Sequence, residues 1–334
     1  MNWLVLTLGA AIICIATLDP LWTTIWVDGH AGPLSRRYGR AVDRLLIKVI
    51  PPDNHRLLSL SGPVVLFMSV LFWALLLWMG WVVLFSADPN ALLDPHTKVR
   101  ATLAGRIYFT GYTMFTLGNG DFAPQGGFWQ IASSLASLSG LFLLTLSVTY
   151  VLAVIEAVVA MRSFASQVWA LGHSPEELVK NCWNGQAFPA VELQILSLTE
   201  QLNAVSEQHQ AYPMLHFYHE ERLPQSVSVN LAIFDDALTI WEFLVPADIR
   251  PAPAALRCAR DSVREFLHGL RDAQIEESPN EPPWIDLAHL REAGVRVLDY
   301  DALDRGGSDL DVRRRHLLGF VEEERLDWPS PGRY

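Results

Sequence analysis

The sequence predicts an all-α membrane protein in which a helical soluble domain follows the membrane-spanning part. Of the 334 residues, 51% are hydrophobic, and the mean hydropathy is +0.21. All apolar segments of membrane length lie in the first half of the chain. Residues 1–162 carry 10 Lys and Arg and 8 Asp and Glu, whereas residues 163–334 carry 15 and 28. The acidic second half argues against nucleic acid as a partner, because phosphate binding needs clustered cations.

Three apolar segments are predicted to span the membrane. Gly62–Ser86 has no charged residue, and Phe128–Met161 has one, Glu156, near its end. Both exceed the roughly 20 apolar residues that cross a bilayer. Trp3–Leu18 is shorter and is followed by Asp19-Pro20, where we expect the helix to stop. No Lys or Arg precedes this segment, as a signal peptide would require, so a retained membrane helix is favoured over a cleaved signal.

The distribution of Lys and Arg between the loops predicts the orientation. The loop at 20–61 holds six of them and the loop at 87–127 holds three. The more basic loop should be cytoplasmic, which places the N-terminus outside and residues 163–334 in the cytoplasm, at the plasma (inner) membrane. Residues 35–50 predict a helix with an apolar face and an Arg-rich face. Such a helix fits the inner membrane interface, and an ordinary solvated linker helix fits the same pattern.

The stretch "TMFTLGNGDFAP", residues 113–124, separates the second and third spans. Irregular backbone enters a membrane only where it is buried in protein or lines water. We therefore expect a re-entrant segment, with a helix over Leu103–Phe115 and an extended return through Asn119. Gly118 and Gly120 allow backbone angles that other residues avoid. Carbonyl oxygens and a threonine hydroxyl can then replace the hydration shell of a cation. One chain supplies one strand of such a ring, so the site requires an oligomer.

These residues resemble the potassium-channel signature T-x-x-T-V-G-Y-G-D-x-x-P, and the resemblance covers about residues 62–160. It implies a potassium-channel-like pore of outer helix, pore helix, filter and inner helix in a homotetramer. The permeant ion would be K+ or Na+, with no other cofactor. A weakly selective cation channel is the first alternative, and a membrane-anchored sensor with a remnant pore loop is the second. The implied filter residues are Thr116, Leu117, Gly118, Asn119 and Gly120, with Asp121, Tyr108, Phe109 and Tyr112 as support.

The sequence departs from the family pattern at the support of the filter. Asn119 stands where the family has Tyr or Phe, and Tyr108 and Phe109 stand where it commonly has a Trp pair. In the family a Trp donates a hydrogen bond to the filter Tyr. Phe109 has no donor and Asn119 has no ring, so Asn119 is expected to bond to Tyr112 or Tyr108, or to hold a water behind the filter.

The inner helix carries a glycine twenty residues after the last filter glycine. The resemblance implies that this residue, Gly140, is a gating hinge, although a glycine in a membrane helix also permits close packing. The same alignment implies a cavity lining, with an acid at its cytoplasmic mouth. The implied lining residues are Leu144, Val148, Thr149, Leu152 and Glu156.

The C-terminal half predicts helices without a strand pattern. A capping box begins at Ser174. Further helices are expected over 190–209, 226–244, 254–272, 284–293 and 309–326. No G-x-G-x-x-G follows a strand, so a nucleotide-binding gating domain is not evident. We thus expect three regions: 1–61 as N-terminal span and interfacial linker, 62–162 as pore, and 163–334 as helical cytoplasmic domain.

Two clusters in this half raise further possibilities. His209, His216 and His219 lie near several acids and can be read as a divalent metal site, although packing is the favoured interpretation. Arg313-Arg314-Arg315 predicts a solvated helix face or a contact with anionic lipid. No nucleophile–base pair, phosphate loop or strong metal motif indicates an enzyme. The cysteines, Cys14, Cys182 and Cys258, have no C-x-x-C spacing and predict no disulfide framework.

Overall fold

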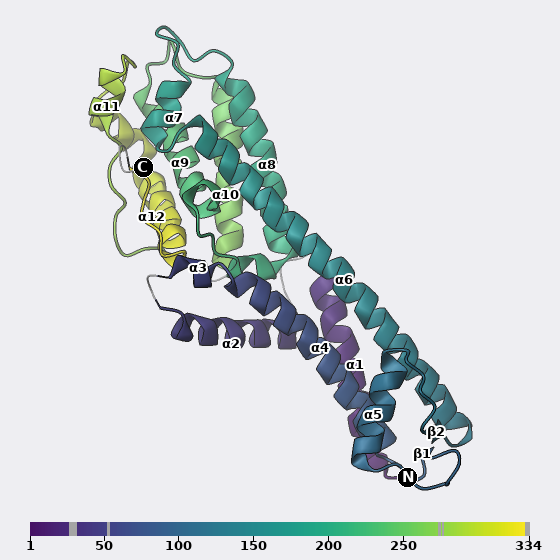
Figure 1. The fold of residues 1–334 in the computed structure, drawn as a ribbon. Helices are drawn as coiled ribbons and strands as arrows, with labels where there is room; N and C mark the ends of the chain where they lie inside the picture. Colours follow the sequence, from purple (N-terminus) through teal and green to yellow (C-terminus); the bar gives the residue numbers. More distant parts are fainter. Residues whose placement is uncertain (27–31, 52–53, 273–274, 276, 331–334) are drawn as a thin grey trace. The chain divides into compact units, whose positions relative to one another are not determined.

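The computed structural model describes residues 1–26, 32–51, 54–272, 275 and 277–330, and Figure 1 shows their course. The elements are α1 (Trp3–Ile25), α2 (Pro33–Val49), α3 (His55–Leu58), α4 (Ser61–Phe85), β1 (Leu92–Leu93), α5 (Leu103–Met114), β2 (Ala123–Pro124), α6 (Gly126–Leu171), α7 (Pro175–Asn181), α8 (Val191–Ala211), η1 (Pro213–Phe217), η2 (Leu223–Gln225), α9 (Val227–Thr239), the π-helix η3 (Ile240–Leu244), α10 (Pro253–Asp272), α11 (Leu287–Glu292), η4 (Tyr300–Gly306) and α12 (Gly307–Glu323).

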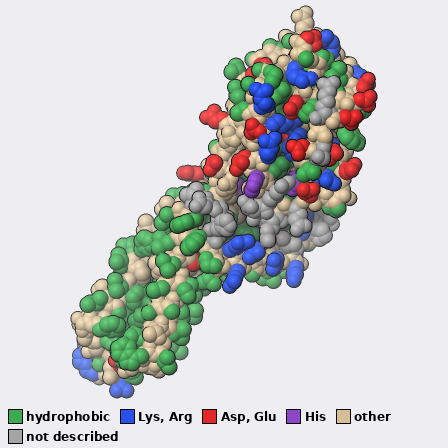
Figure 2. All heavy atoms as spheres, turned by 180° about the vertical axis from the view of Figure 1, so that it is seen from behind, with side chains coloured by type: hydrophobic (Ala, Val, Ile, Leu, Met, Phe, Trp, Pro, Cys, Tyr) green, Lys and Arg blue, Asp and Glu red, His purple; other side chains and the backbone are tan. Residues whose placement is uncertain are grey.

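The chain folds into two compact units. The membrane unit comprises Met1–Leu45 and Pro63–Val154, and the C-terminal unit comprises Leu46–Gly62 and Ile155–Tyr334. The domain boundaries expected after residues 61 and 162 stay predictions. Figure 2 shows that hydrophobic side chains dominate the visible surface of the membrane unit, whereas acidic and basic side chains gather on the C-terminal unit. An all-α membrane protein with a helical C-terminal region is confirmed.

Three helices among the described residues are long and apolar enough to cross a membrane: Trp3–Ile25, His55–Phe85 and Gly126–Leu171. Small residues let the first two approach closely. A Cβ atom on Gly9 would lie 2.6 Å from the Leu84 nitrogen, and one on Gly80 would lie 2.9 Å from Ile13. Because residue numbers rise in α1 as they fall in α4, the two helices are antiparallel.

The expectation that the first helix stops at Asp19-Pro20 is wrong. Helix α1 continues through Pro20 to Ile25. Threonine hydroxyls bond to backbone carbonyls around the proline: Thr23 Oγ1 donates to Asp19 O and Thr24 Oγ1 donates to Pro20 O, both at 2.8 Å. Proline removes the backbone donor to the carbonyl four residues earlier, whereas these two hydroxyls bond to carbonyls of the turn that follows. Membrane helices contain proline more often than soluble helices do. The Asp19-Pro20 pair therefore predicted too short a span.

Helices α4 and α6 form the frame around the pore helix. Trp81 Nε1 donates to Ser139 Oγ at 2.9 Å, and the rings of Trp73 and Tyr150 lie 5.7 Å apart. The two helices therefore run antiparallel along their length. Between them, β1 pairs antiparallel with β2, so that Leu92 lies opposite Pro124. This short pairing joins the loop after α4 to the segment that leads into α6.

The C-terminal unit is built around α9, whose 13 residues are all buried. A helix that is buried on every side is a core element, and α7, α10 and α12 pack around it. The five helices expected from the sequence are confirmed as α8, α9 with η3, α10, α11 and α12, with ends displaced by at most three residues. The capping box is also confirmed, because Ser174 Oγ accepts from Glu177 N at 3.2 Å.

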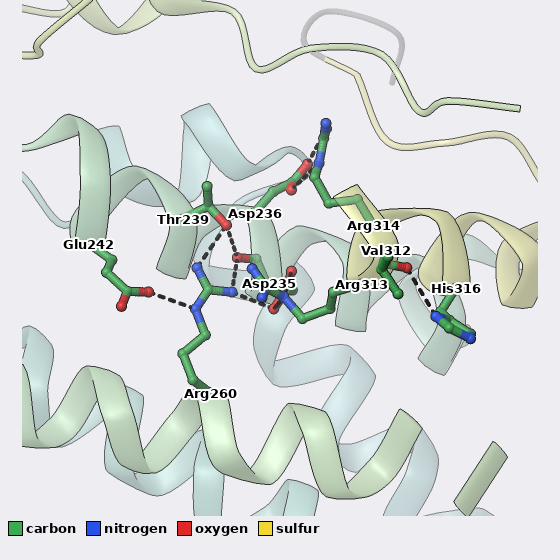
Figure 3. Close-up of polar contacts among 9 residues, drawn as sticks. All are labelled: Asp235, Asp236, Thr239, Glu242, Arg260, Val312, Arg313, Arg314 and His316. Carbon is green, nitrogen blue, oxygen red and sulfur yellow. Dashed lines mark hydrogen bonds and ion pairs between the residues drawn. The ribbon is translucent and has the colours of Figure 1, made fainter. Parts of the chain in front are cut away.

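Two adjacent carboxylates on α9 are buried and paired with arginines from α10 and α12 (Figure 3). Asp235 accepts from Arg260 Nη1 at 2.5 Å and from Arg313 Nε at 3.0 Å. Asp236 accepts from Arg314 Nε at 2.8 Å and Nη2 at 3.0 Å. Burial alone raises the pKa of Asp235, but Arg260 and Arg313 hold it below its ordinary value. The interior of the unit thus contains matched charges that join three helices.

The prediction of a solvated face at Arg313-Arg314-Arg315 is wrong for its first two residues. The side chain of Arg314 is 5% exposed and that of Arg313 is 16% exposed. Arg314 also lies between two indole rings, 5.8 Å from Trp284 and 5.6 Å from Trp328. The free energy of burying these cations is offset by the carboxylates of α9 and by the rings.

Candidate pore and filter

The pore helix α5 begins at a side-chain cap and ends one residue before its expected limit. Thr102 Oγ1 accepts from Gly105 N at 3.1 Å, and the helix ends at Met114. Two glycines of α5 allow aromatic rings to approach the helix closely. A Cβ atom on Gly105 would lie 2.8 Å from the Phe122 ring, and one on Gly111 would lie 2.9 Å from the Trp78 ring. The pore helix is therefore held on both sides by aromatic side chains of its own chain.

The chain folds back directly after the pore helix. Leu117 N donates to Tyr112 O at 2.8 Å, and Thr116 N donates to Thr113 O at 3.2 Å. Along the following residues the backbone angle φ alternates in sign. It is +59° at Thr116, +60° at Gly118 and +82° at Gly120, whereas Leu117 and Asn119 have negative values. The filter segment is thus neither a helix nor an ordinary strand.

Tyr108 of the pore helix joins two polar residues of the return segment. Its hydroxyl accepts from Asn119 Nδ2 at 2.7 Å and donates to Asp121 Oδ2 at 2.8 Å. Of the two tyrosines that the sequence offered to Asn119, Tyr108 makes the contact. The second, Tyr112, donates to Phe122 O at 2.9 Å and accepts from Phe122 N at 3.3 Å. Two tyrosine hydroxyls therefore fasten the return segment to the pore helix.

Phe109 takes no part in this contact. It is 2% exposed, and its ring lies edge-on to Phe85 at 5.2 Å and to Tyr112 at 5.3 Å. Its neighbours are therefore α4 and the next turn of α5. Phe109 packs the pore helix against the outer helix, and the polar support of Asn119 comes from the adjacent residue, Tyr108.

The inner helix α6 runs through Gly140 without a break. A Cβ atom at this position would overlap the Met114 carbonyl oxygen and would lie 3.0 Å from the Met114 Cα. The glycine thus lets α6 approach the end of the pore helix, as the packing interpretation expects. The five residues expected to line a cavity are all exposed in the single chain: Leu144, Val148, Thr149, Leu152 and Glu156.

A hollow of about 390 Å3 opens beside the filter. Its walls come from four parts of the membrane unit: the pore helix, the filter, the segment that leads into β2, and α6. Among the lining residues are Thr113, Thr116, Gly118 and Ser137. Threonine and serine hydroxyls thus lie with filter backbone on one open surface of the chain.

Comparisons with known proteins identify this arrangement. A family model described as an ion channel matches residues 70–157, which run from α4 through the filter into α6. The chain belongs to the ion-channel family. It is 35% identical over 321 residues to an uncharacterized membrane protein, YdjJ, of Bacillus subtilis (strain 168), and the match covers 96% of the channel and 94% of that protein. No solved structure matches the channel.

One residue of the channel's pore helix was not anticipated as a site residue. Arg106 is 7% exposed, and its guanidinium group donates to backbone carbonyls at the end of α4 and in the loop that follows. The acceptors are the carbonyl oxygens of Phe85, Asp88 and Pro89. A helix leaves its last carbonyls without partners, and a cation there also complements the helix dipole. The signal in the sequence was a lone arginine in an otherwise uncharged re-entrant segment.

The histidine cluster of the C-terminal unit has the properties of packed side chains. His209 is 7% exposed, and neither of its ring nitrogens has a hydrogen-bond partner among the described residues. Burial lowers the pKa of His209 to about 3 and that of His219 to about 4. His216 lies 3.4 Å from Glu323. In the part of the chain that the structure describes, no three His, Cys, Asp or Glu side chains are placed to hold a metal ion, and the metal interpretation stays a prediction.

Proposed function

We propose that the chain is one subunit of a homotetrameric potassium channel of the plasma membrane, with its C-terminal unit in the cytoplasm. The observation that carries the proposal is the alternation of φ from Thr116 to Gly120. A backbone in which every second residue is left-handed can turn successive carbonyl oxygens to one side. Carbonyls so arranged, with the Thr116 hydroxyl, are suitable ligands for a dehydrated monovalent cation.

The proposed oligomer follows from the incompleteness of the single chain. A ring of ligands needs several filter strands, and each chain has one. The filter is also open in the isolated chain, since Leu117 is 69% exposed and Phe115 is 53% exposed. We propose that three further copies complete the ring around the filter. Mass measurement of the purified protein in nanodiscs should therefore give four chains, whereas a conducting monomer or dimer would contradict the assembly.

Potassium selectivity is favoured over weak selectivity because the filter retains two glycines and the polar support of the return segment. The runner-up is also based on an observation. Asn119 has no ring, and its amide bonds to Tyr108 at 2.7 Å, so the contact between Trp and the filter Tyr that the potassium-channel signature implies is replaced. In the runner-up, the same pore passes monovalent cations with little preference.

Reversal potentials of the purified channel in planar bilayers test the function. With potassium on one side and sodium on the other, a potassium channel should reverse close to the potassium equilibrium potential. A reversal potential near zero would favour the weakly selective pore. No conductance across a range of voltages, with the tetramer intact, would favour a sensor with a remnant pore loop. Accessibility of Cys258 to an impermeant thiol reagent in sealed vesicles tests the orientation, because it should react only from the cytoplasmic side.

A further inference from the structure

A buried carboxylate fixes the start of α2. Asp19 of α1 is 5% exposed, and its oxygens accept from Leu34 N at 2.9 Å and Ser35 N at 3.1 Å. The Ser35 hydroxyl donates to the same carboxylate and accepts from Trp73 Nε1 of α4 at 2.8 Å. Gly32 lies so close that a Cβ atom would overlap the Asp19 carboxylate. Helix α2 is therefore attached to α1 and α4 at one point.

The depth of this point follows from the two spanning helices. At the opposite end of the pair, Asn2 N donates to Ala87 O at 2.6 Å. Asp19 lies 17 residues from Asn2, and Trp73 lies 14 residues from Ala87. At 1.5 Å per residue these separations are about 26 Å and about 21 Å. The hydrocarbon core of a bilayer is about 30 Å thick, so α2 begins close to its inner edge.

Two exposed tryptophans mark the same level. Trp22 and Trp26 follow Asp19 by about one and two turns of α1, and they are 48% and 53% exposed. Their rings stack at 5.2 Å. Exposed tryptophan is enriched at the headgroup level of membranes. The aromatic pair and the attachment of α2 thus indicate one interface.

Helix α2 presents different chemistry on its two faces. Ser35 and Gly39 are buried, and Tyr38 stacks on Phe72 of α4 at 4.4 Å, so this side packs against the spanning helices. Positions three, four and seven residues apart share one side of a helix. The opposite side carries three arginines at this spacing: Arg37, Arg40 and Arg44. Arg37 and Arg44 are exposed.

We propose that this basic face of α2 binds the anionic headgroups of phospholipids in the cytoplasmic leaflet. Its charge is complementary to phosphate, because Asp43 is the only acidic residue of α2. Leu45 is 63% exposed beside the basic face and can enter the acyl region, as in interfacial amphipathic helices. The attachment to α1 and α4 holds the face at headgroup depth, so the lipid surface is the occupant. The proposal depends on the membrane spans and the orientation, and not on ion selectivity. A failure to bind anionic lipid would therefore not contradict the proposed channel function.

Lipid binding to the full-length protein in non-ionic detergent tests the proposal. Native mass spectrometry counts the phosphatidylglycerol and phosphatidylcholine molecules retained by the wild type and by Arg37→Gln/Arg44→Gln. Each basic residue near an anionic surface contributes about 1 kcal/mol, so the double variant should bind phosphatidylglycerol about thirty-fold more weakly. Phosphatidylcholine binding should not change. Arg37→Lys/Arg44→Lys keeps the charge and should retain most of the preference.

A matched pair of charge removals in the C-terminal unit is the control. Arg257→Gln/Arg264→Gln removes two exposed arginines of α10 and should leave the preference for phosphatidylglycerol intact. Equal loss in both double variants would overturn the proposal. So would displacement of the lipid by glycerol 3-phosphate, which would indicate a site for soluble anions. If Arg37→Gln/Arg44→Gln does not fold, the deciding measurement is lipid binding by the wild type at increasing salt concentration. The preference must weaken as ionic strength rises, and an unchanged preference overturns the proposal.

Discussion

The hydroxyl group of Tyr108 in the pore helix accepts a hydrogen bond of 2.7 Å from the side-chain amide of Asn119 in the filter. The same oxygen donates to Asp121. The hydroxyl oxygen of Tyr108 thus bonds both to Asn119 of the filter and to Asp121, which follows the filter. The side chain of Asn119 thus bonds to the pore helix, and its backbone carbonyl is one of the proposed ion ligands.

We predict that Tyr108→Phe weakens the filter without unfolding the channel. The change removes two hydrogen bonds at a partly exposed site, so we expect a loss of about 1–2 kcal/mol in the stability of the assembled channel. The reversal potential should move toward that of sodium. Tyr38→Phe, which keeps the stack on Phe72, is the control. In a double-mutant cycle, Tyr108→Phe and Asn119→Ala should be coupled by about 1 kcal/mol. Simple additivity would show that the contact contributes nothing.

Arg106 should be among the least replaceable residues of the membrane unit. Arg106→Gln leaves the carbonyls of Phe85, Asp88 and Pro89 without their donor. Buried hydrogen bonds to charged groups contribute about 1.5–3 kcal/mol each, so we expect a loss of about 3 kcal/mol or more. Thermal unfolding in detergent measures it. Arg100→Gln, at an exposed position of the preceding loop, should have little effect. Equal stability of the two variants would contradict the role of Arg106.

Two glycines of α6 allow a matched test of packing against hinging. A Cβ atom at Gly140 would overlap the Met114 carbonyl, whereas one at Gly127 would meet nothing within 4 Å. Gly140→Ala should therefore destabilise the channel by about 1–3 kcal/mol and disturb ion selectivity through the end of the pore helix. Gly127→Ala should be neutral or slightly stabilising. A changed open probability with unchanged selectivity and stability would instead favour a hinge at Gly140.

The stability of the protein should fall with rising pH because of Glu324. Burial raises its pKa from 4.5 to about 7, opposed by hydrogen bonds from Ser226 and Ser228. Between these values the folded state holds a proton that the unfolded state has lost, so stability is full below pH 4.5 and decreases up to pH 7. At about 1.4 kcal/mol per unit the decrease is about 3 kcal/mol. Urea unfolding from pH 5 to 8 should show a flatter profile for Glu324→Gln than for the wild type.

His209 should have the opposite effect on the pH dependence of stability, lowering the stability as the pH falls. Its pKa is lowered to about 3 by burial, with His216 as a further cause. The folded state therefore prefers the neutral ring, and stability is lost as the pH falls below about 6.5. His209→Leu should raise the stability at pH 5 more than at pH 8, whereas His96→Leu, at an exposed loop position, should not. If the stability of His209→Leu depends on pH as that of the wild type does, then His209 is not the group that titrates.

The sequence predicted the pore region better than the charged interior. The spans and the pore helix could be found because apolar length and the TLGNG motif are local signals. Burial of Arg313 and Arg314 could not be found, since it depends on Asp235 and Asp236, which lie 78 residues earlier. Three consecutive arginines are more often solvated, and only tertiary packing reverses that expectation. The continuation of α1 through Pro20 likewise could not be predicted from the Asp19-Pro20 pair alone, because membrane helices contain proline more often than soluble helices do.

For Asn119 the sequence predicted a hydrogen bond to Tyr112, to Tyr108 or to a water, without deciding among them. Its amide needed a partner, and Tyr108 and Tyr112 were both within reach in sequence. The choice follows from Tyr112 being occupied by Phe122 at both its donor and its acceptor. Arg106 was missed because it was read as one charge among those of an external loop, although its surroundings in the sequence were apolar.

The carboxylates of α9 set the order in which the C-terminal unit can be completed during synthesis. Asp235 and Asp236 leave the ribosome first, Arg260 follows 25 residues later, and Arg313 and Arg314 follow only after 78. Until then α9 cannot be enclosed without burying unpaired charge, which is strongly unfavourable. The unit should therefore stay open to protease on the ribosome until α12 has emerged and then close in one step. Protection of a nascent chain that ends before Arg313 would contradict this order.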